Sequence, residues 1–152
     1  MSKRLMKDYR EIADDPNSPF QITLVNNNMK DWIVEFDGPE ETNYTGLHFR
    51  LSVKFTVLFI QIFNIQDKFP FQVPRFQFLS KVYHPNVFSD GSICLDIIKP
   101  EKWSTVMRMQ GVLMSIMDLL SDPNLNSPAN GSASGNWNRG DIKEICKKNH
   151  RV

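Results

Sequence analysis

The segment that most narrows the folds open to this chain runs from residue 47 to residue 55. Apolar side chains occupy every second position in it: Leu47, Phe49, Leu51, Val53 and Phe55. Successive side chains of a strand point to opposite faces, so these five share one face and predict a β-strand with one buried side. The chain therefore contains a sheet, and the segments around this strand decide its fold class.

Shorter strand-like stretches lie on both sides of it. Residues 20–25 and 31–36 alternate in the same way, with a turn of three asparagines at 26–28 between them. The turn residues at 37–39 close this hairpin, and residues 76–78 form the core of a fourth strand. Turn residues between alternating segments are typical of antiparallel hairpins.

Helical spacing appears at both ends of the chain. Residues 2–14 predict an amphipathic helix, ended by the prolines of 15–19, and residues 106–120 predict a buried helix. A last helix is expected at 141–148, with Asp141 as its N-cap. The residues expected to be buried are Leu5, Met6, Tyr9, Ile12, Met109, Val112, Leu113, Ile116, Met117 and Leu120. Helix, antiparallel strands, long loop and helices is an α+β order.

Length and charge limit the function classes. A chain of 152 residues is expected to form a single domain, 1–152. Its net charge of +1 predicts neither a nucleic-acid nor a membrane partner. It has no apolar core of a signal peptide and no apolar run of the roughly 20 residues that a membrane span needs.

The cysteines and histidines argue against structural cross-links. Cys94 and Cys146 make no disulfide framework, so a reducing compartment, the cytoplasm or the nucleus, is expected. No pair among His48, His84, Cys94 and Cys146 has metal-ligand spacing, so no metal is expected. No glycine-rich phosphate loop is present either, and the sequence therefore predicts no cofactor.

The most informative motif for chemistry is HPNVFSDGSIC, residues 84–94. Cys94 follows a turn-rich loop at 89–92, and such loops lie at the surface. Asn86 supplies an amide that can donate hydrogen bonds, and Pro85 stiffens the loop. Sulfur can hold an acyl group, and a donor can stabilise the oxyanion that forms when that group is attacked. The motif therefore predicts an acyl-transfer site.

HPNVFSDGSICLD, followed by Lys102-Trp103-Ser104, resembles the active-site region of ubiquitin-conjugating enzymes. The resemblance covers most of the chain. It includes residues 4–9, Asn27-Asn28-Met29 with Trp32, Gly38-Pro39-Glu40, Phe69-Pro70-Phe71 with Pro74, Asp122-Pro123-Asn124 and Ser127-Pro128-Ala129-Asn130. It implies a fold with an N-terminal helix, a four-stranded antiparallel meander, a long active-site loop and C-terminal helices. Asn27-Asn28-Met29, Phe78-Leu79-Ser80-Lys81 and the Ser-Pro-Ala-Asn element look most like the DNA-repair and histone-ubiquitylating subgroup.

The resemblance also implies a reaction. Cys94 would accept ubiquitin as a thioester from the activating enzyme, which spends the ATP, and pass it to a substrate lysine with a RING-type ligase. Asn86 would stabilise the oxyanion or hold the active-site loop, and both roles stay open. His84 would brace the loop, and Pro85 would set its path. Two alternatives are another ubiquitin-like cargo and an inactive ubiquitin-binding module, although members of the latter kind lack the cysteine.

Further residues match positions that line the approach of the incoming lysine: Asp96, Asn124 and Ser127. The attacking amine must be neutral, so a partly desolvated groove with nearby acceptors would assist it. Ser127 precedes Pro128, which fits either a phosphorylation site or a simple turn.

By the same resemblance, two sets of residues would contact partner enzymes. The first helix would dock the activating enzyme, and a ligase would contact two loops. The residues are Lys3, Arg4 and Lys7 on the helix, and Phe71, Ser104 and Val106 on the loops.

The chain departs from the family pattern in three places. Thr105 stands where relatives usually have proline, and one extra residue lies between Cys94 and Trp103, so we expect altered ligase binding. An apolar insertion at about 56–65 lengthens the third and fourth strands, covers an apolar surface, or is a gene-model error. Glycines at 131, 135 and 140 interrupt a region that relatives have as helix, each costing about 1 kcal/mol in a helix interior.

Overall fold

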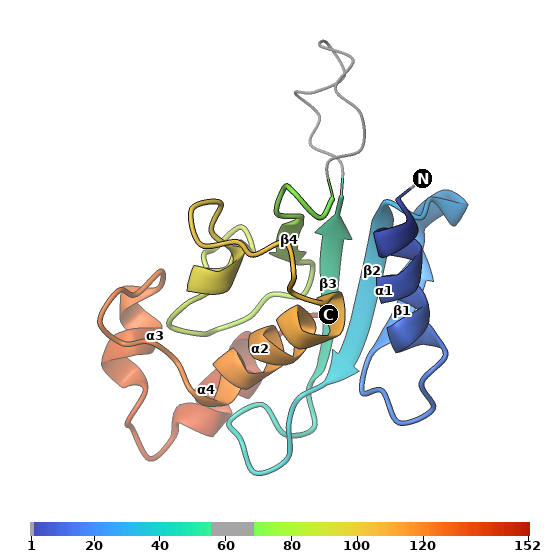
Figure 1. Cartoon of the computed structure of the whole chain (residues 1–152). Coiled ribbons are helices and arrows are strands. Elements are labelled where there is room, and N and C mark those ends of the chain that lie inside the picture. The colour runs from blue at the N-terminus through green and yellow to red at the C-terminus, as the bar shows by residue number, and fades with distance from the viewer. Residues whose placement is uncertain (1, 56–68) are drawn as a thin grey trace.

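The central element is an antiparallel sheet with the strand order β1-β2-β3-β4. The computed structural model describes residues 2–55 and 69–152, and within them the strands are β1 (Gln21–Leu24), β2 (Asp31–Asp37), β3 (His48–Lys54) and β4 (Arg75–Phe78). Each strand pairs with the next along the chain (Figure 1). The predicted meander and the α+β class are thereby confirmed.

The alternation predicted for 47–55 is confirmed within one residue at each end. Val53, Leu51 and Phe49 of β3 lie opposite Trp32, Val34 and Phe36 of β2, and all six side chains are buried. The rings of Phe36 and Phe49 stack with their centres 5.4 Å apart. Cross-strand aromatic pairs of this kind stabilise a sheet beyond the area that they bury.

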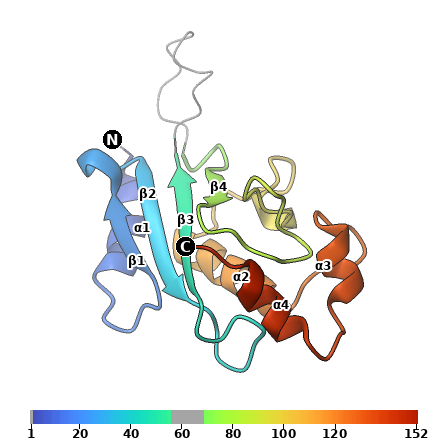
Figure 2. The same cartoon turned by 180° about the vertical axis from the view of Figure 1, so that it is seen from behind.

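Two helices cover the apolar face of the sheet. In Figure 1, α1 (Lys3–Ala13) and α2 (Met109–Ser121) both lie in front of the strands, and Figure 2 shows the sheet from the other side. Ser2 caps α1, because its hydroxyl accepts a hydrogen bond from the amide of Leu5 at 3.4 Å. Leu5 and Ile12 are buried against the sheet, and Met6 and Tyr9 are half-buried.

The prediction that the buried helix begins at 106 is wrong. Residues 104–107 form a turn in which the amide of Met107 donates to the carbonyl of Ser104 at 3.1 Å. Arg108 is extended, and α2 begins at Met109, with Val106 79% exposed. Val106 fits the helical spacing, so the pattern alone could not place the start. The six core residues predicted for this helix are all buried.

The C-terminal region contains α3 (Gly131–Asn136) and α4 (Ile142–Asn149). The last helix has its N-cap at Asp141, as predicted, and ends one residue later than predicted. Asp141 stands at the N-cap position, but its carboxylate makes no capping hydrogen bond and instead pairs with Arg139 through two contacts of 2.8 Å. Gly131 and Gly135 lie within α3, and Gly140 lies between the two helices.

The predicted insertion and the question of a membrane span remain to be placed. The apolar insertion at 56–65 lies outside the described residues. Within the described ranges, no helix is long and apolar enough to cross a membrane.

Candidate active site

The residues of the acyl-transfer motif form a tight loop that brings its two ends together. The amide of Cys94 donates to the carbonyl of Asn86 at 2.8 Å, and Val87 and Ile93 form a β-bridge. Between them the amide of Phe88 donates to the carbonyl of Ser92 at 2.9 Å. Residues eight apart in sequence are therefore neighbours in space, and the half-buried thiol of Cys94 sits at the end of the loop.

Gly91 attaches this loop to the sheet. It has a φ of +89°, and a Cβ built on it would stand 2.1 Å from the carbonyl oxygen of Phe78. The carbonyl of Gly91 accepts a hydrogen bond from the Phe78 amide at 2.9 Å. Only glycine combines this backbone conformation with so close an approach. The sequence Ser-Asp-Gly-Ser therefore folds back against β4, and this contact fixes the loop that carries Cys94.

Asn86 is buried, and its side chain forms hydrogen bonds with the backbone of another segment. Its Nδ2 donates to the carbonyl of Asn124 at 2.7 Å, and its Oδ1 accepts from the amide of Asn124 at 2.8 Å. The neighbouring carbonyl of Pro85 accepts from the amides of Ala129 and Asn130 at 2.7 and 3.0 Å. Of the two roles left open for Asn86, this geometry directly supports holding the loop.

His84 links the same loop to the end of α2. Its Nε2 lies 2.7 Å from the carbonyl oxygen of Leu119, and its Nδ1 lies 2.9 Å from the amide nitrogen of Asn86. A carbonyl only accepts and an amide only donates, so the proton is on Nε2 and the ring is neutral. Burial lowers the pKa of His84 to about 4, against the smaller opposing effect of the Leu119 carbonyl. These contacts support the bracing role that the resemblance implied for His84, and the role stays a prediction.

The three residues predicted to line the lysine approach do not all lie at the active-site loop. Asp96 begins the short 3-10 helix η3 (Asp96–Ile98) two residues after Cys94, and its carboxylate lies 2.8 Å from the ammonium of Lys99. That hydrogen bond holds the pKa of Asp96 below its usual value. Asn124 adjoins Asn86, whereas exposed Ser127 shares no hydrogen bond with the site among the described residues.

The residues predicted to contact partner enzymes lie at the start of α1 and on two loops that are tied together. The indole of Trp103 donates to the carbonyl of Pro70 at 2.7 Å, which joins the loop of Phe71 to the turn of Ser104 and Val106. Phe71 is 77% exposed and Val106 is 79% exposed. Both are therefore open to a partner. Lys3 and Lys7 are also exposed, and Ser104 is half-buried.

Comparison with known proteins identifies the family. The family described as "Ubiquitin-conjugating enzyme" matches residues 4–151. The chain belongs to the ubiquitin-conjugating enzyme family. It is 37% identical over 132 residues to "Ubiquitin-conjugating enzyme E2 1" of Caenorhabditis elegans, covering 87% of this chain and 63% of that protein. It is 38% identical over 132 residues to "Ubiquitin-conjugating enzyme E2 3" of Arabidopsis thaliana, covering 87% of this chain and 81% of that protein.

Ubiquitin-conjugating enzymes are transferases that work through a thioester intermediate, and their partners are ubiquitin, an activating enzyme and ligases. The family and its fold agree with what the sequence resemblance implied. The roles of the individual residues, including Cys94, stay predictions.

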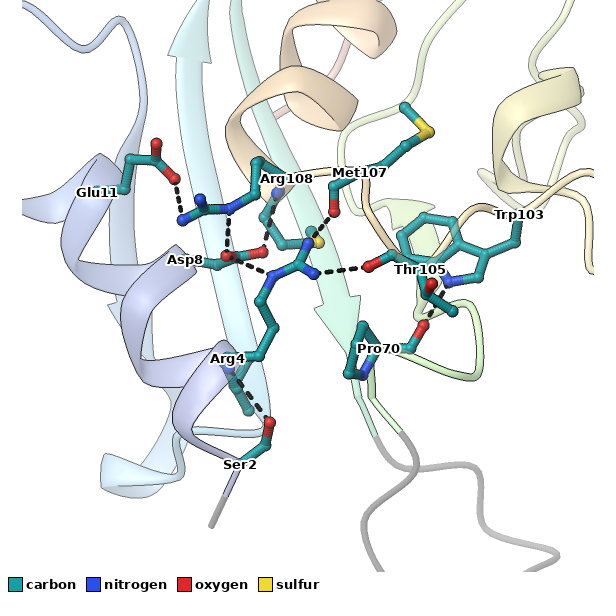
Figure 3. Close-up of polar contacts among 11 residues, drawn as sticks. Ser2, Arg4, Asp8, Glu11, Pro70, Trp103, Thr105, Met107 and Arg108 are labelled. Atoms are coloured by element: carbon teal, nitrogen blue, oxygen red, sulfur yellow. Dashed lines mark hydrogen bonds and ion pairs between the residues drawn. The ribbon is translucent and has the colours of Figure 1, made fainter.

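One ionic cluster was not predicted from the sequence. Asp8 is fully buried, and Figure 3 shows its carboxylate between the side chains of Arg4 and Arg108. Its Oδ1 accepts from Arg4 Nε at 2.9 Å and from Arg108 Nε at 2.8 Å, and its Oδ2 accepts from the amide of Met109 at 3.1 Å. Arg108 also pairs with Glu11 at 2.6 Å.

A signal for this cluster was present in the sequence. Asp8 follows Leu5 by three positions and precedes Ile12 by four, so it lies on the apolar face of α1. An acidic residue on such a face is rarely buried without partners. Here it caps the first amide of α2 from another helix.

The burial of His84 predicts a pH dependence of stability. Its pKa in the folded protein, about 4, lies below the value of 6.5 for an exposed histidine. The stability it contributes is therefore complete above pH 6.5 and is lost as the pH falls towards 4, because only the unfolded state then binds the proton. The loss amounts to about 3 kcal/mol.

Urea unfolding at intervals between pH 7 and 4.5 measures this loss, and NMR titration of the His84 ring gives its pKa directly. His48 acts in the opposite direction: its pKa is raised, chiefly by Asp37, so the stability that it contributes is complete below pH 6.5 and is lost as the pH rises above that value. A His84 ring that titrates near 6.5 would contradict the prediction.

Replacing Asn86 by alanine is expected to lower the free energy of unfolding by about 1–3 kcal/mol. The change leaves the amide and carbonyl of Asn124 without their partners in the described structure. Urea midpoints measure the effect. Asn126→Ala, an exposed amide on the same segment, is the matched control and should change stability by less than about 0.5 kcal/mol. Equal effects of the two changes would argue against a bracing role.

Proposed function

We propose that this protein accepts ubiquitin from an activating enzyme as a thioester on Cys94 and transfers it to a substrate lysine. The observation that carries the proposal is the position of Cys94. Its thiol is free and half-buried, and its amide is bonded to Asn86, which is anchored in turn to Asn124. Family membership supplies the cargo and the reaction type.

The proposed chemistry consists of two acyl exchanges. The Cys94 thiolate attacks the carbonyl carbon of the thioester between ubiquitin and the activating enzyme, and the sulfur of the activating enzyme leaves with the electron pair. The nitrogen of a neutral lysine amine then bonds to the carbonyl carbon of the new thioester, the Cys94 sulfur leaves with the electron pair of the broken bond, and the nitrogen loses a proton to water. The first step exchanges one thioester for another, so it needs no strong driving force, and the thiolate is the working species. We propose that neither step uses a metal or an organic cofactor.

We propose that Asn86 acts chiefly by holding the loop in place. Both of its side-chain polar atoms are already bonded to Asn124, which joins the loop of Cys94 to the segment after α2. Such support keeps the thioester and the incoming amine in a fixed geometry, which is itself a large part of catalysis.

We propose that the lysine reaches Cys94 past Asp96 and Asn124, with Ser127 at the outer edge. Asp96 lies two residues after Cys94, at the start of η3, and Asn124 adjoins the loop through Asn86. Asp96 carries an exposed ion pair with Lys99, which the approaching lysine displaces before its amine contacts that carboxylate.

We propose that the activating enzyme docks on α1 and that a RING-type ligase contacts Phe71, Ser104 and Val106. The exposure of Phe71 and Val106 on two joined loops supports this surface. We also propose membership of the DNA-repair and histone-ubiquitylating subgroup, supported by the residue patterns named above, and a location in the cytoplasm or nucleus.

A charging assay tests the proposal. The wild-type protein is mixed with activating enzyme, ubiquitin and ATP, and the products are compared on reducing and non-reducing gels. We expect an adduct that depends on ATP and disappears under reduction. Absence of an adduct from folded protein would overturn the proposal, and the same assay with other ubiquitin-like proteins would then identify a different cargo or an inactive binding module.

A further inference from the structure

The turn 104–107 lies on the proposed ligase surface and has threonine at a position that favours proline. The bond from the Met107 amide to the Ser104 carbonyl makes Thr105 the second residue of a β-turn. That position favours proline, whose ring fixes φ at the value the turn needs. Thr105 stands there instead, and its amide makes no hydrogen bond within the described residues. Something else must hold this turn.

The side chain of Arg4 takes that place. Its Nη1 donates to the carbonyl of Thr105 at 2.6 Å, and its Nη2 donates to the carbonyl of Met107. Figure 3 shows the guanidinium lying between Asp8 and these two carbonyls. A planar guanidinium can donate in several fixed directions at once, so a single side chain reaches both ends of the turn.

Arg4 is itself held from two further sides. Its Nε donates to Asp8 at 2.9 Å, and its guanidinium lies 5.6 Å from the centre of the Phe69 ring. Its side chain is only 20% exposed. Lys3 and Lys7, in contrast, are exposed on the same helix. Arg4 is therefore directed into the protein rather than towards a partner.

We propose that Arg4 is a positioning residue, which fixes the turn 104–107 as a proline at position 105 would, and so presents Val106 to the ligase. Val106 lies between the two carbonyls that Arg4 binds and is 79% exposed. This inference rests on the proposed function for the identity of the partners, but the claim about the turn stands on the contacts alone.

Hydrogen exchange tests the claim about the turn. Arg4→Lys keeps a positive charge beside Asp8, but one ammonium cannot reach both carbonyls. We expect exchange in the peptide that covers residues 103–108 to become about tenfold faster in Arg4→Lys. The double variant Arg4→Lys/Thr105→Pro should exchange at the wild-type rate, because the ring restores the constraint. Arg10→Ala, an exposed arginine of the same helix, is the matched control and should leave exchange unchanged.

Ligase kinetics test the consequence. With Cys94 charged with fluorescent ubiquitin, the concentration of a RING-type ligase that gives half-maximal discharge to lysine should rise about fivefold in Arg4→Lys with the maximal rate unchanged, and Thr105→Pro should restore it. Unchanged exchange in Arg4→Lys would overturn the proposal. Faster exchange with a half-maximal ligase concentration that proline does not restore would show instead that Arg4 contacts the partner directly. If the wild-type protein does not charge at all, the proposed function fails, and exchange alone decides whether Arg4 holds the turn.

Discussion

Replacing Cys94 by alanine is expected to abolish the thiol-sensitive ubiquitin adduct completely. In the proposed function the adduct is a bond between the ubiquitin carboxyl carbon and the Cys94 sulfur, and we expect no other side chain to take over that role. Cys146, the other cysteine, is 1% exposed, and burial raises the pKa of its thiol, so it is neither accessible nor readily ionised. Loss of an essential nucleophile typically costs many orders of magnitude in rate.

Two companion variants make this experiment decisive. Cys94→Ser should give either no adduct or a slowly formed one that survives reduction, because an oxygen ester is not cleaved by thiols as a thioester is. Cys146→Ala should charge normally, since it removes only a small buried side chain. A thiol-sensitive adduct that persists in Cys94→Ala would show that the acceptor lies elsewhere.

Replacing Asp8 by alanine is expected to lower the free energy of unfolding by about 3–5 kcal/mol. The carboxylate is fully buried and offsets the charges of Arg4 and Arg108, and it also caps the first amide of α2. Removing it leaves two guanidinium groups close together without their shared partner. Because small domains are stable by only about 5–15 kcal/mol, the variant should be close to unfolding at moderate temperature.

Urea unfolding of the two proteins at pH 7 and low temperature measures the loss. Asp14→Ala is the matched control, since it removes an exposed carboxylate at the other end of α1 and should change stability by less than about 0.5 kcal/mol. A loss below about 1 kcal/mol in Asp8→Ala would mean that water replaces the carboxylate easily.

The sequence predicted the regular elements closely where burial follows a local period. The strand at 47–55 and the six core residues of α2 follow from spacing alone. The start of α2 did not, because Val106 fits the apolar pattern although it lies in a turn. The amide that marks the true start, on Met109, is capped by Asp8, which is 101 positions away in the chain.

The candidate site shows the same division. The motif at 84–94 predicted that Cys94 and Asn86 belong to one site, and its turn residues indicated a loop. It could not show that Asn86 reaches Asn124, because that contact joins residues 38 positions apart. Arg4 was predicted, with the other basic residues of α1, to contact a partner enzyme, since a helical pattern gives only the approximate face of the helix on which a side chain lies. Its actual direction depends on carbonyls more than 100 positions away.

By itself, therefore, the sequence determined the α+β class and the position of most elements, because these depend on local periods, and its resemblance to ubiquitin-conjugating enzymes indicated the family. Only the tertiary structure decided what holds the active-site loop, where Arg4 points and why Asp8 is buried. Those answers depend on hydrogen bonds and ion pairs between distant segments, which form only when α1, α2 and the loops pack together on one sheet.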